Sequence, residues 1–390
     1  MLRVLTLSTL FPNAVQPNSG IFVGHQTARL AAHPGVELQV VNPVALPPAP
    51  FDLWPSYRGL RAVPRDAAWR GLRVDRPRFS IAPGLSGAWN PGAVYRATRP
   101  VLRRLRAEGF LFDVIDAEFF YPDGPAAARL ATEFGVPFSI KARGADIHYW
   151  GGRAACRRQI LDAAARAGGL LAVAESLKRD MVAMGMEAGK IAVHYTGVDL
   201  GHFQPADRVR AKTALGVTGK LVASVGALIP RKGHDLVIDA MVELPGVTLL
   251  IAGAGPERGR LQAQVEARGL GARVRLLGSV AHAEVPGLLG AADAMALASD
   301  SEGLANAWVE ALACGTPIVI PEVDGAAEVV DRPAAGRLLD ARTPAAIADA
   351  IRAILAHPPE QGAVRASAER FIWERNTEAL FRHLSGLKRS

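Results

Sequence analysis

The chain has 390 residues, 49% of them hydrophobic and 21% charged, and its 45 Lys and Arg against 37 Asp and Glu give a formal net charge of +8. A chain of this length outgrows one hydrophobic core, so two domains are expected. Its two cysteines, Cys156 and Cys314, lie far apart with no histidine pattern beside them. This argues against a disulfide framework or a zinc site and predicts a reducing compartment.

The N-terminal residues 1–7 are apolar but few, and Pro12 follows soon after them. A secretion signal needs a longer apolar core, so a buried first strand is the better interpretation. No run approaches the ~18 apolar residues that a membrane span needs. We therefore expect a cytoplasmic protein.

Apolar runs and helical stretches alternate along the whole chain, a pattern typical of α/β domains with doubly wound parallel sheets. In the first half the predicted strands are 2–7, 37–41, 114–116, 138–141, 170–174 and 191–194. In the second half they are 221–225, 248–252, 273–277, 294–298, 318–320 and 337–339. Each set is large enough for one sheet, so two Rossmann-like domains that face a central cleft are the simplest prediction.

Two stretches of the first half, 58–78 and 96–106, are dense in arginine. In the second, Val94, Leu102 and Leu105 lie among the arginines, which predicts an amphipathic, basic helix. Such a helix can rest on anionic lipid or receive a phosphorylated acceptor molecule. A plain solvated helix is the alternative. The arginines lack interleaved aromatic residues, so no nucleic-acid partner is expected.

The boundary between the domains is expected between Gly197 and Gly219, where a glycine follows a strand and a proline lies shortly downstream. We place the first domain at residues 1–203 and the second at 204–370. The remaining residues, 371–390, have helical spacing and are expected to pack back on the first domain.

Ligands of open α/β sheets bind at the carboxyl ends of the strands, and the segment 301–317 follows such a strand end. A polar loop precedes a helix that is expected to begin with Asn306 as its N-cap, and Gly315 followed by Pro317 should end it. The free backbone N–H groups of residues 303–305 suit an anion or sugar oxygens.

Two glutamates flank this helix start, Glu302 in the loop and Glu310 on the helix. Their carboxylates can hold two different sets of hydroxyl groups. Taken singly, each also fits a structural role, as a first-turn helix residue or an exposed, paired glutamate.

A second loop, after the first strand of the second domain, contains Gly226, Arg231 and Lys232. Glycine lets a ligand approach the backbone, and a lysine beside it can neutralise a diphosphate. Two surface cations before a helix are the structural alternative.

Together these segments resemble glycosyltransferase family 4, whose donor-binding motif has two glutamates separated by seven residues before an Ala-Cys-Gly-Thr-Pro run. The resemblance implies a GT-B fold and a retaining transfer that needs neither a metal nor a cofactor. It implies that residues 1–203 bind the acceptor and residues 204–370 the nucleotide sugar. The implied donor-binding residues are Gly20, Gly226, Arg231, Lys232, Gly253, Gly278, Val280, Glu302, Gly303, Leu304, Ala305 and Glu310.

This sequence departs from the family at three positions. Ala227 stands where an arginine usually binds the diphosphate, and Arg231 is a candidate replacement. Arg143 stands where many relatives have an active-site histidine, and its guanidinium can instead hold an acceptor phosphate or a donor carboxylate. Leu304 replaces a frequent aromatic residue, which leaves the donor sugar open. The candidate catalytic residues are Glu302, Arg143, Lys232 and Arg231.

Carboxylates and a tyrosine follow the predicted strands 114–116 and 138–141, where an acceptor is expected. The candidate acceptor-binding residues are Glu118, Tyr121, Asp123 and Asp146. For Asp146 a structural cap of the following turn is equally open.

The resemblance implies a UDP- or GDP-sugar as donor. The acceptor is expected to be lipid-linked or an oligosaccharide, in cell-surface or secreted polysaccharide synthesis at the inner face of a membrane. Two alternatives remain, a sugar-nucleotide isomerase or epimerase of the same fold, and a degenerate, non-catalytic binder of sugar nucleotides.

Overall fold

The computed structural model describes residues 1–54, 57–85 and 87–388. The chain forms two compact units. The first consists of Met1–Gly197 and the segment from Trp373 onward, and the second of Val198–Ile372. The chain therefore passes between units at 197 and again at 372, rather than at 203 and 370, and residues 389–390 of the C-terminal segment lie outside the described residues.

The first unit is built on an eight-stranded sheet with the order β10-β9-β8-β7-β1-β2-β5-β4. All neighbouring strands are parallel except β4 and β5, and a small parallel sheet of β3 and β6 lies apart from it. The strands are β1 (Leu2–Leu7), β2 (Val36–Val41), β3 (Val44–Leu46), β4 (Asp66–Trp69), β5 (Leu72–Asp75), β6 (Arg78–Ser80), β7 (Val114–Ala117), β8 (Phe138–Ala142), β9 (Gly169–Ala172) and β10 (Ile191–Val193).

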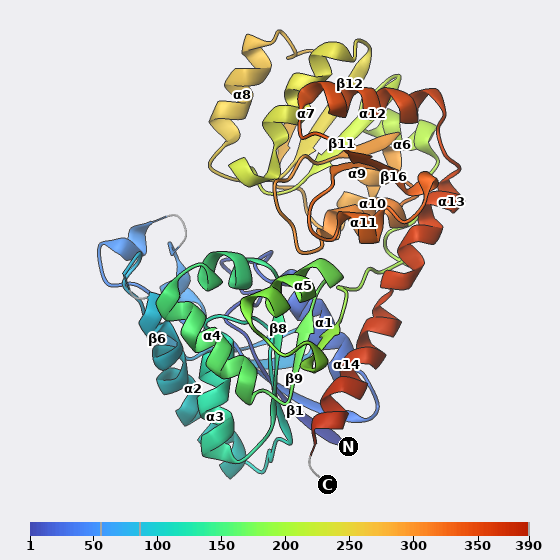
Figure 1. Cartoon of the computed structure of the whole chain (residues 1–390). Helices are drawn as coiled ribbons and strands as arrows, with labels where there is room; N and C mark the ends of the chain where they lie inside the picture. Colours follow the sequence, from blue (N-terminus) through green and yellow to red (C-terminus); the bar gives the residue numbers. More distant parts are fainter. Residues whose placement is uncertain (55–56, 86, 389–390) are drawn as a thin grey trace. The chain divides into compact units, whose positions relative to one another are not determined.

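The helices of the first unit supply apolar faces that cover this sheet. They are α1 (Ile21–Ala31), α2 (Asn90–Ala107), α3 (Asp123–Phe134), α4 (Ala154–Arg166), α5 (Glu175–Met184) and α14 (Trp373–Leu387). The last helix is far from the others in sequence, yet it packs on α1 beside β1 (Figure 1). Leu380 and Leu384 of α14 are fully buried there, in one cluster with Leu2 and Val4 of β1.

The second unit has a six-stranded, wholly parallel sheet with the order β13-β12-β11-β14-β15-β16. Its strands are β11 (Lys220–Val225), β12 (Val247–Ala252), β13 (Val274–Gly278), β14 (Ala294–Ala296), β15 (Ile318–Pro321) and β16 (Gly336–Leu339). Its helices are α6 (Arg208–Ala214), α7 (His234–Ala240), α8 (Arg258–Ala267), α9 (Val285–Ala291), α10 (Asn306–Ala313), α11 (Ala326–Val329), α12 (Pro344–Ala356) and α13 (Gln361–Arg365). The central strands are almost continuously buried, as a parallel sheet covered on both faces requires.

The doubly wound fold class predicted from the sequence is confirmed, but four strands between residues 44 and 80 were missed. Each of them has only three or four residues. The hairpin of β4 and β5 turns at Arg70 and Gly71, which both have positive φ, 47° and 81°. Strands this short, in a stretch with many arginines, have too few apolar residues for the two-residue alternation of a strand to be recognised.

Each sheet reverses its strand order at one point, and ligands of such folds bind there. In the first unit the reversal lies between β1 and β7, and in the second between β11 and β14. The loops that leave these four strands therefore define where a site is to be sought.

Candidate functional site

The reversal point of the second unit brings together Glu302, Lys232 and Arg231. Lys232 Nζ donates a hydrogen bond to Glu302 Oε1, and Arg231 NH1 lies 3.5 Å from Glu302 Oε2. The Glu302 side chain is 8% exposed and that of Lys232 is 14% exposed, whereas Arg231 is 42% exposed. Two cations therefore face one carboxylate, so the cluster carries a net positive charge and suits an anionic ligand.

The backbone holds the two loops of this cluster against each other. Gly233 has φ +64°, and a Cβ at this position would lie 2.1 Å from the carbonyl O of Ala298. The N–H of Asp300 donates to the carbonyl O of Arg231 at 2.9 Å, and Arg231 NH1 also donates to the carbonyl of Ser301. Only glycine permits this approach, which brings the lysine and the glutamate within reach of each other.

The glutamate loop leads into α10 as expected, with one correction. Ala305 rather than Asn306 is the N-cap, and no side chain caps the helix. Within the described part of the chain, the N–H groups of residues 303–305 donate no hydrogen bond. They are therefore free for a ligand, next to the positive end of the α10 dipole.

The far end of α10 is closed by the glycine that the sequence indicated. The N–H of Gly315 donates to Leu312 and that of Thr316 donates to Ala311, both at 2.9 Å. This pair of bonds is the Schellman motif that commonly ends helices.

Glu310 lies about one turn after the start of α10 and contacts a different group. Its Oε1 is 3.6 Å from Nε2 of His282, whose ring stacks on that of His202 with 5.5 Å between centroids. The two glutamates thus mark two separate subsites in the second unit. The histidine partner was not predicted, because it lies 28 residues away in sequence with no motif around it.

Three of the five glycines predicted to bind the donor lie at the ends of the neighbouring strands β11, β12 and β13. The N–H of Gly226 donates to Ala252 at 3.0 Å, and the N–H of Gly253 donates to the carbonyl of Gly278 at 2.8 Å. Val280 follows in the next loop. Leu304, in the same loop as Glu302, is largely buried, with an exposure of 8%.

The reversal point of the first unit contains a buried charged cluster around Glu118. Arg143 NH2 donates to Glu118 Oε2, and Gln26 Nε2 donates to Oε1. The Arg143 side chain is 5% exposed and lies 4.7 Å from the ring centre of Phe22. Burial alone would raise the pKa of Glu118, but the charges of Lys141 and Arg143 outweigh it and lower that pKa to about 2.

This pairing changes the role expected for Arg143. Its guanidinium is engaged by the Glu118 carboxylate and, through Nε at 2.9 Å, by the Glu118 carbonyl. Glu118 itself is fully buried. Neither side chain therefore offers a free charge to an anionic ligand in this conformation.

A lysine and a histidine that the sequence did not single out for this site extend the cluster. Lys141 Nζ donates to Gln26 Oε1 at 2.5 Å and to Nδ1 of His194. Nε2 of His194 donates to the carbonyl O of Asn376 on α14 at 2.8 Å. Burial lowers the pKa of Lys141 to about 7 and lowers that of His194 as well. These partners lie 53 to 182 residues apart, which is why no local pattern indicates them.

The other three predicted acceptor residues are buried and have protein partners. The Tyr121 hydroxyl donates to the carbonyl of Gly87 at 2.6 Å. Asp146 accepts from the N–H groups of Phe120 at 2.7 Å and Arg143 at 2.9 Å, which favours its structural interpretation. Asp123 accepts from the N–H of Thr9 at 2.8 Å, and burial raises its pKa to about 7.

Gly20 ends the loop that leaves β1 and precedes α1. It has φ +65°, and a Cβ would lie 2.5 Å from the backbone of Leu10. The packing of the first unit therefore requires glycine at this position, independently of the donor-binding role predicted for Gly20.

The basic stretch 96–106 forms most of α2, but its cations are largely paired. Arg99 and Arg103 bind Glu133 of α3 at 2.8 and 2.7 Å, and Arg104 binds Asp75 at 2.5 Å. Hydrogen bonds from Arg99, and then from Tyr95, lower the pKa of Glu133 to about 2. The arginines of α2 are thus partly neutralised by their own unit.

Comparisons with known proteins identify both halves of the chain. A family model described as Glycosyltransferase Family 4 matches residues 25–202, and one described as Glycosyl transferases group 1 matches residues 206–371. The D-inositol 3-phosphate glycosyltransferase of Mycobacterium tuberculosis is 35% identical over 238 residues, which cover 57% of this chain and 49% of that protein. The chain thus spans about half the length of the curated relatives that it matches.

Solved structures share the fold over nearly the whole chain. Sucrose-phosphate synthase from Thermosynechococcus elongatus has a TM-score of 0.81 at 19% identity and covers 99% of this chain and 100% of its own. The Anabaena protein HepE in complex with UDP-glucose has a TM-score of 0.75 at 20% identity, with the same coverage. The fold of the chain is GT-B. Among the helices of the described residues, none is both long and apolar enough to cross a bilayer.

Proposed function

The chain belongs to glycosyltransferase family 4, and we propose that it transfers a sugar from a nucleoside diphosphate sugar to an acceptor hydroxyl, with retention of anomeric configuration and without a metal ion. The observation that carries this proposal is the cluster of Lys232, Arg231 and Glu302 at the reversal point of the second unit. It joins two cations, one carboxylate and the free amides of residues 303–305.

Each part of this cluster matches one part of such a donor. Lys232 and Arg231 neutralise the diphosphate, and the free amides before α10 bind its oxygens. Glu302 accepts hydrogen bonds from the hydroxyls of the sugar, and Glu310 from those of the ribose. Because Lys232 has three N–H donors, it can keep Glu302 as a partner while it binds a phosphate oxygen.

The proposed reaction needs no side chain as a base. The bond between the anomeric carbon and the diphosphate oxygen breaks, and a bond from the acceptor oxygen forms on the same face of the sugar. The departing diphosphate takes the proton of the acceptor hydroxyl. Lys232 and Arg231 stabilise the negative charge that develops on this leaving group.

The acceptor is proposed to be lipid-linked or an oligosaccharide, bound by the first unit at the inner face of a membrane during cell-surface or secreted polysaccharide synthesis. A UDP- or GDP-sugar is the proposed donor, and the bound ligand of HepE, UDP-glucose, supports the former. At the reversal point of the second unit, cations and free amides remain for an anion, whereas the charges near Glu118 at the reversal point of the first unit are paired with one another. This contrast supports the assignment of the donor to the second unit.

Measurement of donor binding by variants of two lysines in similar surroundings tests this proposal. Lys232 and Glu302 are 14% and 8% exposed, and Lys212 and Asp293 form a pair elsewhere in the second unit with 14% and 11% exposure. We expect UDP- or GDP-sugars to raise the melting temperature of the wild type. Lys232→Met should reduce donor affinity by about 10- to 100-fold, the value of one charge-assisted hydrogen bond.

Lys212→Met is the control, because it breaks a comparable ion pair far from the glutamate loop. It should lower the melting temperature of the free protein about as much as Lys232→Met and leave the donor-induced shift intact. If UDP-, GDP- and ADP-sugars all fail to stabilise the wild type, or if both variants lose the shift equally, the proposed donor site is wrong.

A further inference from the structure

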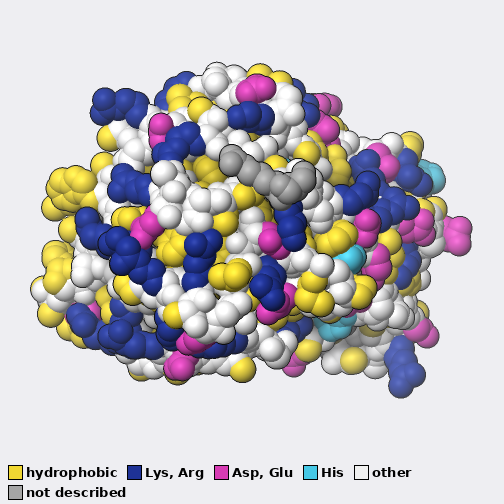
Figure 2. All heavy atoms as spheres, turned by 90° about the horizontal axis from the view of Figure 1, so that it is seen from below, with side chains coloured by type: hydrophobic (Ala, Val, Ile, Leu, Met, Phe, Trp, Pro, Cys, Tyr) yellow, Lys and Arg dark blue, Asp and Glu magenta, His cyan; other side chains and the backbone are white. Residues whose placement is uncertain are grey.

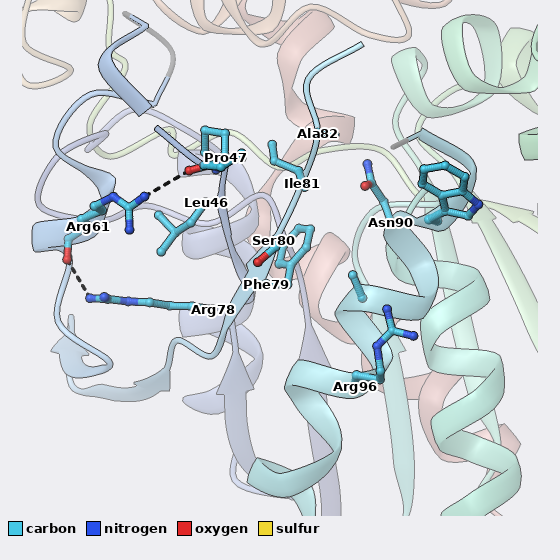
Figure 3. Close-up of a pocket in the computed structure, with 13 residues that line it drawn as sticks. Leu46, Pro47, Arg61, Arg78, Phe79, Ser80, Ile81, Ala82, Asn90 and Arg96 are labelled. Atoms are coloured by element: carbon cyan, nitrogen blue, oxygen red, sulfur yellow. Dashed lines mark hydrogen bonds between the residues drawn. The ribbon is translucent and has the colours of Figure 1, made fainter. Parts of the chain in front are cut away.

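A cavity of about 590 Å³ lies in the first unit, between the small sheet of β3 and β6 and the start of α2. Apolar side chains line it, among them Leu46, Phe79 and Ile81, together with the cations Arg61, Arg78 and Arg96. Figure 3 shows Arg61 and Arg78 on one side of Phe79 and Ser80, and Arg96 on the other. The cavity thus combines an apolar lining with positive charge on two sides.

Two of the three cations have no carboxylate partner in the described part of the chain. Arg78 NH2 donates to the carbonyls of Arg61 at 2.7 Å and Val63 at 3.0 Å. Because these carbonyls are neutral, the positive charge of Arg78 is not compensated. Arg96 is exposed and forms no hydrogen bond or ion pair with any described residue. Arg61 pairs with Asp52 at 2.8 Å. Over residues 47–96 the chain has eight arginines and three aspartates and no lysine or glutamate, so an anionic partner fits.

Exposed apolar side chains gather on the two loops that flank this cavity. In the first loop, Phe51, Leu53 and Trp54 are 38%, 65% and 50% exposed, and in the second, Leu85 and Trp89 are 79% and 70% exposed. The first loop is joined to the cavity through Asp52 and Arg61, and Trp89 lines the cavity itself. Exposed tryptophans beside arginines are typical of a surface at the boundary between water and hydrocarbon.

We propose that this cavity and its two flanking loops form the surface by which the protein rests on an anionic phospholipid bilayer. Lipid phosphates lie against Arg78 and Arg96, and the exposed side chains of the two loops enter the boundary between headgroups and acyl chains. The proposal rests on the proposed function for its setting, since a lipid-linked acceptor is presented at a membrane. This surface takes the place of Arg99, Arg103 and Arg104 as the expected membrane contact, because those three arginines pair with Glu133 and Asp75.

Basic side chains on one face of the molecule do not by themselves define a membrane contact. Figure 2 shows a face of the molecule on which Lys and Arg side chains are spread among hydrophobic ones. Basic side chains alone give weak attraction, which salt screens. In the cavity region the basic charge occurs together with exposed tryptophans, and burial of such apolar surface in the bilayer adds to the electrostatic attraction.

Vesicle co-sedimentation of the whole protein without any nucleotide tests the proposal. The probes are vesicles of phosphatidylcholine alone, of phosphatidylcholine with 30% phosphatidylglycerol, and of phosphatidylcholine with a polyprenyl phosphate. We expect binding to the anionic vesicles only, and weaker binding at high salt. Arg78→Gln with Arg96→Gln should reduce the partition coefficient about 30-fold, since each arginine near such a surface contributes about fivefold. Leu85→Ser with Trp89→Ser should also weaken binding.

Matched controls remove the same charge and the same kind of apolar group elsewhere in the chain. Arg99→Gln with Arg103→Gln takes two cations from the same helix, and Leu111→Ser with Val242→Ser removes side chains that are 55% and 51% exposed. Both controls should retain most of the binding. Because Arg78 also bonds two carbonyls, Arg96→Gln alone is measured as well, with an expected fivefold loss and an unchanged melting temperature.

Absence of binding to the anionic vesicles would overturn the proposal, as would an equal loss in the cavity variants and the controls. Binding only to vesicles that contain a polyprenyl phosphate would overturn it too, because the cavity would then recognise an acceptor lipid rather than the bilayer. Since no donor is present, these outcomes do not depend on whether the protein transfers a sugar.

Discussion

At the scale of residues, the two units use buried carboxylates in different ways. Glu302 faces two cations beside free backbone amides, so its cluster retains positive charge for a ligand. Glu118 is enclosed by Arg143 and Gln26, so its charge is satisfied inside the protein. The first arrangement is suited to binding, and the second fixes the loops of the first unit at the reversal point of its sheet.

Asp123 offers a residue-scale prediction that depends on pH. Burial raises its pKa from the ordinary 3.8 to about 7, so the folded state favours the protonated form. The stabilisation of the folded state by the protonated carboxyl is complete below pH 4. It is lost as the pH rises through 7, because the buried carboxyl must then ionise. The asparagine of Asp123→Asn cannot ionise. The free energy of unfolding of this variant minus that of the wild type should therefore rise by roughly 2–3 kcal/mol from pH 5 to pH 8.

Urea denaturation of both proteins at the two pH values measures this change. Asp162→Asn is the control, because Asp162 is 67% exposed on α4 of the same unit. Its difference from the wild type should be the same at both pH values. A pH-independent difference for Asp123→Asn would show that the buried carboxyl ionises as it does in water.

The residues of the two sites differ in how far the sequence could predict them. Glu302, Lys232 and Glu310 lie in local motifs, and the structure places the first two in contact. Lys141 and His194 lie 53 residues apart and meet only because β8 and the end of β10 belong to one sheet. A single sequence contains no signal for such pairs. The pairing of Arg143 with Glu118 was missed for the same reason.

At the scale of elements, the loops after β11 and β14 depend on one glycine. The glycine before α7 brings the lysine loop within backbone contact of Ala298. The strands that define these loops were predicted well, because buried parallel strands are long apolar runs. The predicted N-cap of α10, Asn306, is wrong by one residue. The N-cap is Ala305, which has no side chain that could accept a hydrogen bond from the first amides of the helix.

A pair of glycine substitutions tests the importance of this contact. Gly233 and Gly269 both have positive φ, 64° and 67°, but a Cβ at Gly269 meets nothing within 4 Å. Gly269→Ala should therefore cost about 1 kcal/mol of stability and leave donor affinity unchanged. Gly233→Ala should cost more and reduce donor affinity at least tenfold, because the loop with Lys232 must move. Isothermal titration with the donor measures both, and equal affinities in the two variants would contradict this role of the loop.

At the scale of the whole molecule, the chain builds one Rossmann-like unit, then a second, and returns to the first with α14. The alternation of strands and helices predicts two such units, and the fold comparisons confirm the GT-B class. We expected the C-terminal helix on the first domain but did not predict its contact with β1, which joins residues about 380 positions apart. That contact depends on burial of Leu380 and Leu384, and helical spacing alone does not identify the surface that covers them.

The central claim is that this protein moves a sugar with retention and without a metal ion, and product analysis tests it most directly. The wild type is incubated with the nucleotide sugar that stabilises it, an acceptor and EDTA, and NMR determines the configuration of the new glycosidic bond. We predict release of the nucleoside diphosphate and a product with the donor's anomeric configuration. Glu302→Gln should slow this release at least 100-fold, while Glu266→Gln, at an exposed position of α8 in the same unit, should not. An inverted product, a requirement for added metal, or equal turnover in both variants would contradict the account.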